Sequence, residues 1–351
     1  MARIVHAIDY RSPVAGSFIP AVAALSRALR ARGHESIVAA PRVAQTPPWH
    51  EALLQSGASI HETDRYADLY ALFARLRPQL VHVHFSGYAV ASAIGAMLHG
   101  VSNLYWHVHS SPGEASIPLR SRLLRTAKFA GLARRVSRIF AVTPEIAMEL
   151  ERFGAPRRKL AVIENGIAVE RFVVPSTPER RAARHGFGLA ADERVALFFG
   201  RDAAIKGTAV LRAALAGATR PPTVLFVGPA GDAEGLEPFT RVVRCEGLDD
   251  VRPALWAGDS IVMPSSTEGL PLTLLEARAC GLPALVSEIP PLARYAGRDR
   301  GATAIERGDI ARWARSLDAI DSGARVPLSQ ELRAAISLDR WVDEVLKSYD
   351  L

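Results

Sequence analysis

The sequence contains little cysteine and no long hydrophobic run, and both absences limit what the protein can be. Its 351 residues include two cysteines, Cys245 and Cys280, which make neither a disulfide framework nor a zinc signature. The longest apolar-leaning stretch, from Tyr88 to Leu98, is much shorter than the roughly 20 residues that cross a bilayer. The N-terminal apolar run is too short for a signal peptide. We therefore expect a cytoplasmic protein, with peripheral attachment to the inner face of the membrane left open.

Two common phosphate-binding motifs are also absent. The dinucleotide fingerprint G-x-G-x-x-G has no match after a predicted strand, because Gly228-Pro-Ala-Gly231 has the wrong spacing. The P-loop requires Gly-Lys-Ser/Thr, whereas residues 206–208 read Lys-Gly-Thr. These absences exclude NAD-dependent dehydrogenases and P-loop NTPases.

The overall composition is that of an ordinary soluble globular protein. Apolar residues make up 49% and charged residues 23%, which excludes disordered and fibrous classes. At roughly 100–200 residues per domain, the length predicts two domains. The net charge of +7 favours an anionic partner such as nucleic acid, a phosphorylated small molecule or an acidic membrane surface. No nucleic-acid recognition motif accompanies the charge, so we expect no nucleic-acid partner.

Short apolar runs alternate with helical patterns along the whole chain. The expected strands are residues 4–8, 36–40, 80–84, 103–108, 138–142, 195–199, 223–227, 260–263 and 284–287. Strands that are apolar throughout and separated by helices indicate parallel sheets covered on both faces. The predicted class is therefore α/β, with two Rossmann-like, doubly wound domains. Because the periodicity lapses in one segment, we expect domains at 1–168 and 194–336, a linker at 169–193 and a final helix at 337–351.

One strand-to-helix loop of the second half carries two cations. The segment runs Gly200-Arg201-Asp-Ala-Ala-Ile-Lys206-Gly207 directly after a predicted strand. Beside the free N–H groups of the next helix, an Arg and a Lys make a suitable clamp for a diphosphate. Taken alone, the segment fits a solvated basic loop equally well.

A second loop supplies two carboxylates. After the predicted strand 260–263, the chain reads Pro264-Ser-Ser-Thr-Glu268-Gly-Leu-Pro-Leu-Thr-Leu-Leu-Glu276. Glu268 lies in the loop and Glu276 in the following helix. The first N–H groups of that helix can hold a phosphate, and a carboxylate can accept hydrogen bonds from ribose or sugar hydroxyls. The two loops together favour a site for a phosphorylated sugar compound.

At these residues the sequence resembles a known family. Glu268 to Glu276 matches the E-x7-E motif of retaining nucleotide-sugar glycosyltransferases with the GT-B fold, glycosyltransferase family 4. Gly200-Arg201 and Lys206-Gly207 match the family's "Gly-Arg … Lys-Gly" loop. Residues 142–145, 164–167 and 170–172 resemble its inter-domain stretch. The resemblance covers nearly the whole chain and is strongest from residue 138 to 286.

The resemblance implies a role for each matched residue. Arg201 and Lys206 would stabilise the charge on the leaving diphosphate, as the departure of an anion requires. Glu276 would bind the ribose hydroxyls and Glu268 the hydroxyls of the transferred sugar. Further donor contacts are expected at Gly200, Gly269, Leu270, Leu272 and, in a loop that resembles the family's glycine-rich loop, Gly16. The resemblance also implies that the final helix returns to the N-terminal domain.

Two histidine pairs, His82/His84 and His107/His109, have the i, i+2 spacing that puts two side chains on one face of a strand. Zinc favours such pairs, but no carboxylate or cysteine lies close by to complete a site, so we expect no metal. Hydrogen-bonded histidines at the sheet termini are the alternative. The resemblance implies a functional histidine that meets the donor sugar; His109 matches its place best and His107 is the alternative.

The stretch Ile117–Phe140 carries seven cations and no acidic residue. With leucines between the cations, it is typical of a basic amphipathic helix that contacts an anionic membrane or a phosphorylated acceptor. A helix that packs one face on the sheet and exposes the other is the alternative.

The expected activity is metal-independent, retaining transfer of a sugar from a UDP-, GDP- or other nucleoside-diphosphate sugar to an acceptor hydroxyl of a glycolipid, polysaccharide or natural product. The sequence departs from the family at Ala168, where Asp is frequent, and at Ile289–Tyr295, where Gly-Gly-x-x-Glu is frequent. The resemblance implies that the second segment lies near the nucleotide, so we expect an unusual donor. The alternatives are a phosphorylase or hydrolase on the same fold and a non-catalytic binding or scaffold protein.

Overall fold

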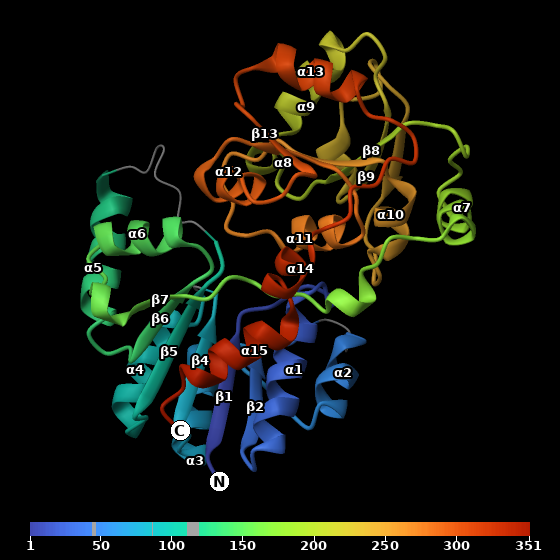
Figure 1. The fold of residues 1–351 in the computed structure, drawn as a ribbon. Coiled ribbons are helices and arrows are strands. Elements are labelled where there is room, and N and C mark those ends of the chain that lie inside the picture. The colour runs from blue at the N-terminus through green and yellow to red at the C-terminus, as the bar shows by residue number, and fades with distance from the viewer. Residues whose placement is uncertain (44–46, 86, 111–118) are drawn as a thin grey trace. The chain divides into compact units, whose positions relative to one another are not determined.

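The structure is a computed structural model that describes residues 1–43, 47–85, 87–110 and 119–351. The chain divides into two compact units: residues 1–166 with 338–351, and residues 167–337. Each unit contains one sheet in which all strands are parallel (Figure 1). The α/β class with two Rossmann-like sheets, predicted from the alternating apolar pattern, is therefore confirmed.

The first unit has a seven-stranded sheet in the order β3-β2-β1-β4-β5-β6-β7. Its elements are β1 (Arg3–Ile8), α1 (Phe18–Ala31), β2 (Glu35–Ala40), α2 (Trp49–Gln55), β3 (Ser59–Glu62), α3 (Tyr66–Leu76), β4 (Leu80–His84), α4 (Ala89–His99), β5 (Asn103–Val108), α5 (Leu119–Leu132), β6 (Arg138–Ala141), α6 (Pro144–Arg152), η1 (Arg157–Lys159), β7 (Leu160–Val162) and α15 (Leu338–Lys347).

Alternate residues of the first sheet enter two different layers. Val5, Val83 and Trp106 belong to a core that also includes side chains of α3, α4 and α6. The opposite face carries His6 and His82, and here α1 packs against α15 (Figure 1). Period-two alternation of strand side chains produces this division.

The second unit has a six-stranded sheet in the order β10-β9-β8-β11-β12-β13. Its elements are η2 (Val169–Arg171), α7 (Thr177–Gly186), β8 (Val195–Phe199), α8 (Ala203–Lys206), α9 (Thr208–Gly217), β9 (Thr223–Val227), η3 (Ala230–Ala233), β10 (Val242–Cys245), α10 (Arg252–Ala257), β11 (Ser260–Met263), α11 (Leu272–Ala279), β12 (Ala284–Ser287), α12 (Pro290–Ala296), β13 (Ala302–Ile305), α13 (Ile310–Asp318) and α14 (Gln330–Ala335).

The second sheet is also covered on both faces. Val195, Leu197 and Ile261 pack with side chains of α10, α11 and α12. Phe198 and Phe226 point the other way and pack with α9 and α13. Burial on both faces explains why the central strands of this sheet are mostly apolar.

The segment expected as a linker, 169–193, belongs to the second unit in the structure. It contains η2 and α7, and α7 packs against α10. The box formed by Ser176 and Glu179 caps α7, with the Ser176 hydroxyl accepting from the Glu179 N–H and the Glu179 carboxylate accepting from the Ser176 N–H. The prolines and polar residues on which the linker expectation rests lie before α7 and in its first turn.

The structure places residues 338–351 in the first unit. Tyr349 shares a hydrogen bond with His82, with 2.6 Å between the hydroxyl oxygen and Nδ1. The Tyr105 hydroxyl donates to a carboxylate oxygen of Asp350 at 3.1 Å. The apolar side of α15 is buried, with Trp341 and Val345 at 2% and 0% exposure.

Candidate donor site and histidine cluster

The loops that follow β8 and β11 carry the cations and carboxylates singled out in the sequence. These two strands are neighbours in the second sheet, so the loops after their carboxyl ends lie at the same edge. In open parallel sheets this edge is where ligands bind. The Ser266 N–H donates to the Ile205 carbonyl at 2.8 Å, which ties the two loops together.

Glycines allow the loops at this edge to approach closely. Gly207 has φ of +79°, and a Cβ there would overlap the carbonyl oxygen of Pro264. A Cβ on Gly228, after β9, would overlap the carbonyl oxygen of Gly200. Gly200 itself has no room for a side chain, because a Cβ would overlap the ring of Phe226. These close approaches require glycine.

Lys206 and Glu268 form an ion pair across the two loops. Lys206 Nζ lies 2.6 Å from Glu268 Oε1, with the side chains 27% and 10% exposed. The Ser265 hydroxyl donates to the same oxygen at 2.8 Å. Ser265 was not singled out in the sequence, although it lies in the same loop, three residues before Glu268. It holds the carboxylate beside the ammonium group, so the ion pair keeps the Lys206 ammonium in a fixed position at this edge.

Glu276 lies in α11 and is only 2% exposed. Its Oε1 is buried and has no hydrogen-bond partner among the described residues. Burial raises the pKa of this carboxyl to about 8; the positive charge of Arg171 lowers it and the negative charge of Asp250 raises it further. A buried carboxyl without a partner is costly, and hydroxyl donors from a ligand would satisfy it.

The other residues expected at the donor site lie around this group. Arg201 is exposed and directly follows Gly200. Gly269 and Leu270 are buried in the loop before α11, and Leu272 is its first residue. The first N–H groups of a helix have no partner within the helix. The segment Ile289–Tyr295, which differs from the family's Gly-Gly-x-x-Glu pattern, forms most of the short helix α12.

In the first unit, Gly16 lies in the loop between β1 and α1. Its φ is +51°, which favours glycine. The Tyr10 hydroxyl donates to the Val14 and Ala15 carbonyls at 2.8 and 3.0 Å and so shapes this loop. A Cβ on Gly16 would lie 3.3 Å from the same hydroxyl oxygen.

Five histidines gather at the carboxyl end of the central strands of the first sheet. His6 is the register partner of His82, and His84 is that of His107. His109 follows β5, with its Nε2 3.3 Å from His84 Nδ1. The sequence identified the two pairs separately, whereas the parallel register brings both together and adds His6.

Burial keeps these histidines neutral. It lowers the pKa of His6 to about 4 and that of His109 to about 3. The pKa values of His82, His84 and His107 lie well below the ordinary value, because of burial and then of the neighbouring histidines. Both ring nitrogens of His6 and of His107 lack a partner among the described residues.

The cluster contains two groups whose ligand atoms lie within 4.8 Å of one another: His6, His82 and His84, and His84, His107 and His109. Neither group contains the carboxylate or cysteine that the histidine pairs lack in the sequence. A third imidazole completes each group, and neutral imidazole is the form that binds zinc.

The basic segment is only partly described, because Ile117 and Pro118 lie outside the described residues. Within α5, Leu123 and Leu124 are 61% and 62% exposed, whereas Phe129 is 5% exposed. Among the helices of the described residues, none combines the length and apolar character that a bilayer crossing requires.

Comparison with known proteins identifies this architecture. Residues 21–171 match the model of Glycosyltransferase Family 4, and residues 193–320 match that of Glycosyl transferases group 1. Over 99% of this chain, Anabaena Alr3699/HepE in complex with UDP-glucose superposes with a TM-score of 0.80 at 17% identity, covering 100% of that chain. WaaG, a glycosyltransferase involved in lipopolysaccharide biosynthesis, gives 0.64 at 17% identity, over 99% of this chain and 96% of that one. The fold is therefore that of the GT-B glycosyltransferases.

Curated relatives agree with this class. The D-inositol 3-phosphate glycosyltransferase of Salinispora arenicola is 31% identical over 57% of this chain and 51% of its own length. The enzyme of that name from Mycolicibacterium smegmatis is 25% identical over 56% of this chain and 48% of its own length. The matched part thus spans about half the length of these relatives. The two family models and these relatives together support a glycosyltransferase of the family 4 type.

Proposed function

We propose that the protein is a retaining glycosyltransferase that moves a sugar from a nucleoside-diphosphate sugar to an acceptor hydroxyl without a metal ion. The observation that carries the donor assignment is Glu276, a buried carboxyl with an unpartnered oxygen at the ligand-binding edge of the second sheet. Ribose hydroxyls are donors that would satisfy it.

The cations of the same edge suit a leaving diphosphate. Lys206 is held beside Glu268 at 2.6 Å, and Arg201 is exposed on the same loop. Fixed positive charge lowers the barrier to departure of an anion because it needs no reorganisation during the reaction. Glu268, oriented by Ser265, would accept hydrogen bonds from the transferred sugar. The two cations supply the charge that a metal would otherwise provide.

The retaining outcome rests on the resemblance to the family. We propose same-face attack by the acceptor hydroxyl: the glycosidic bond to the diphosphate breaks, the bond to the acceptor oxygen forms, and the departing phosphate takes the acceptor's proton. His109 would meet the donor sugar, and its neutral imidazole can accept a hydrogen bond. His107 is less suited, since it is fully buried.

The donor is tested by thermal stabilisation with UDP-, GDP-, ADP- and TDP-sugars, with and without EDTA. A nucleotide that binds the folded state raises the melting temperature by mass action. We expect one class of donor to give a shift that EDTA leaves unchanged and that Glu276→Gln removes. A shift that EDTA abolishes would contradict metal independence. Absence of any shift would contradict the donor site.

The acceptor is tested next with the donor so found. Several relatives are named for D-inositol 3-phosphate, so a phosphorylated polyol is the first acceptor to assay, followed by glycolipids. NMR of the product's anomeric centre shows whether configuration is retained. Sugar release without any acceptor would favour a hydrolase, and donor binding without turnover would favour a scaffold protein.

We also propose that α5 contacts an anionic membrane surface. The exposed pair Leu123 and Leu124 supplies the apolar contact that a basic amphipathic helix needs at such a surface. Co-sedimentation with vesicles that contain phosphatidylglycerol is expected for the wild type and reduced in L123E/L124E. Equal sedimentation of both proteins would contradict this contact.

A further inference from the structure

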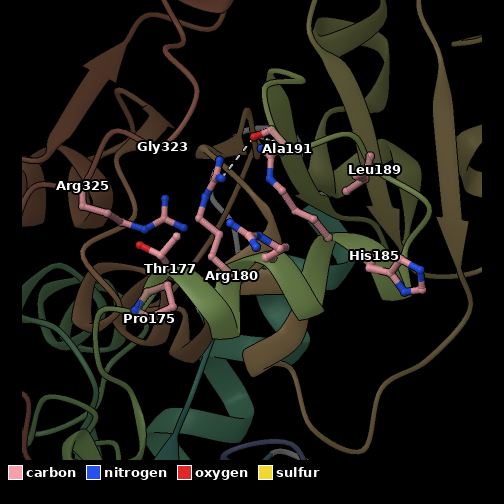
Figure 2. A pocket seen from close by; sticks show the side chains of 10 residues that line it. Pro175, Thr177, Arg180, His185, Leu189, Ala191, Gly323 and Arg325 are labelled. Carbon is pink, nitrogen blue, oxygen red and sulfur yellow. Dashed lines mark hydrogen bonds between the residues drawn. The ribbon is translucent and has the colours of Figure 1, made fainter.

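A cavity of about 490 Å³ lies beside α7 in the second unit. Its wall contains four arginines and a histidine, and no aspartate or glutamate: Arg180, Arg181, Arg184, His185 and Arg325. Figure 2 shows Arg325 and Thr177 at one end and His185 and Leu189 at the other. The volume falls within the range of roughly 300–1,000 Å³ typical of small-molecule sites. We call this cavity the arginine pocket.

The positive charge of the arginine pocket exceeds what nearby carboxylates neutralise. Asp259 is fully engaged: one oxygen accepts from Arg180 and the Gly323 N–H, and the other from Arg184 and the Val195 N–H, at 2.7–2.8 Å. It offsets one of the two guanidinium groups that it bonds. One positive charge of the Arg180 and Arg184 pair therefore stays uncompensated, and the charges of Arg181 and Arg325 add to it.

Several donors in the pocket lack an acceptor. The Nε atoms of Arg180, Arg184 and Arg325 are buried and have no partner among the described residues, and the Arg184 side chain is 1% exposed. Burial lowers the pKa of Arg325 to about 10; Asp259 raises it and the neighbouring Arg180 and Arg184 lower it. The terminal nitrogens of Arg184 and Arg325 donate to Asp259 or to backbone carbonyls. These bonds to neutral carbonyls hold the guanidinium groups in place but leave their charge uncompensated, and this excess positive charge favours an added anion.

The arginine pocket is separate from the donor site. Asp259 immediately precedes β11, and Val195 is the first residue of β8, so the pocket lies at the amino edge of the second sheet. Lys206 and Glu268 follow the carboxyl ends of the same two strands. A four-residue strand spans about 13 Å, and one ligand of phosphate size therefore cannot reach both sites.

We propose that the arginine pocket binds a small phosphate-bearing anion, a phosphate monoester or a pyrophosphate. Guanidinium groups match phosphate oxygens in pairs and remain charged when buried. Thr177 and His185 add donors at the two ends of the pocket. The phosphate can come from a soluble metabolite or from a lipid headgroup, since the chemistry that recognises it is the same.

The test uses inorganic pyrophosphate and titration calorimetry at constant ionic strength in chloride. The parent is Lys206→Ala, which removes one cation of the donor site. Ala191 lines the pocket and is exposed, whereas the adjacent Ala190 is exposed but does not line it. Ala191→Glu therefore adds a carboxylate to the pocket and keeps every arginine, and Ala190→Glu is the matched control.

We expect the parent to bind one equivalent of pyrophosphate, Ala190→Glu to bind it about equally well, and Ala191→Glu to bind it at least roughly tenfold more weakly. Equal affinity in the two glutamate variants would overturn the proposal, as would the absence of saturable binding by the parent at millimolar pyrophosphate. If Ala191→Glu fails to fold, Arg181→Ala, which removes an exposed lining cation, must weaken binding instead.

Vesicles separate the two sources of phosphate. Phosphatidylcholine vesicles with and without phosphatidate are sedimented with wild type, Ala191→Glu and Ala190→Glu. Sedimentation that requires phosphatidate and is reduced only by Ala191→Glu assigns the phosphate to a lipid. Pyrophosphate binding together with sedimentation that does not respond to Ala191→Glu assigns it to a soluble compound.

Discussion

Replacing Glu276 by glutamine separates the cost of this carboxyl to the fold from its use in binding. The side chain is 2% exposed, and one of its oxygens has no partner among the described residues. Glutamine has nearly the same shape but does not ionise. We expect the variant to bind the donor more weakly. We also expect that, as the pH rises, the free energy of unfolding falls more for the wild type than for the variant.

The sign and size of this pH-dependent change in stability follow from the pKa of Glu276, which burial raises from 4.5 to about 8. The unfolded chain ionises above pH 4.5 while the folded protein stays protonated, so the wild type loses stability as the pH rises from 4.5 to 8. At 1.36 kcal/mol per pKa unit, the loss between pH 5 and pH 8 is about 3 kcal/mol. For a unit of this size it corresponds to roughly 6–12 °C in melting temperature.

The assay compares melting of wild type and Glu276→Gln at pH 5 and pH 8. A pH-independent cost of the buried amide cancels in this comparison, and so does the titration of every other group. We expect the wild type to lose stability relative to the variant by about 3 kcal/mol between the two pH values. A difference that does not change with pH would refute the raised pKa. Unchanged donor affinity in the variant would refute its role toward ribose.

Three further outcomes are expected. Lys206→Ala should lower kcat by roughly 100- to 1,000-fold, the usual effect of removing one charge-stabilising donor; steady-state kinetics check this, and an effect on KM alone would contradict a role in leaving-group departure. His109→Ala should lower turnover while donor-induced stabilisation persists, whereas loss of donor binding would show that the imidazole acts in binding alone. Because burial holds the pKa values of His6 and His109 near 4 and 3, the folded protein takes up fewer protons than the unfolded chain. In the Glu276→Gln variant, which lacks the opposing titration of that carboxyl, stability should therefore fall as the pH drops below about 6.5. A melting temperature of this variant that is flat between pH 7 and pH 5 would show that the cluster is not buried.

The gathering of the candidate donor residues at one edge was largely predictable because these residues are local to two loops. Gly200, Lys206, Glu268 and Glu276 stand at fixed distances along the chain from the strands that precede them. The alternating apolar pattern located those strands, so the edge at which the side chains gather followed. What the sequence did not reveal is that Ser265 orients Glu268: a serine in a loop carries no signal until its partner is placed.

The histidine cluster and the arginine pocket depend on long-range placement. His6 enters the cluster because β1 pairs with β4 in a register that sets it beside His82. Tyr349 reaches His82 from the other end of the chain. Arg184 bonds Asp259 across 75 positions. Period and spacing describe neighbours within about two helical turns, so pairings of this kind need the sheet order as well as the pattern.

The two edges of the second sheet should act independently, and stability can show whether they do. Glu276→Gln acts after the carboxyl end of β11, and Ala191→Glu acts beside the residues that precede β8 and β11. The two positions share no bonded partner among the described residues, and one strand length separates the edges. Effects at such distances usually add within about 0.5 kcal/mol. We therefore expect the free-energy change of the double variant, measured at pH 8, to equal the sum of the two single changes. A larger departure would show that the strands transmit strain from the arginine pocket to the donor site. Pyrophosphate bound at one edge would then alter nucleotide affinity at the other, because coupling between two binding sites is reciprocal.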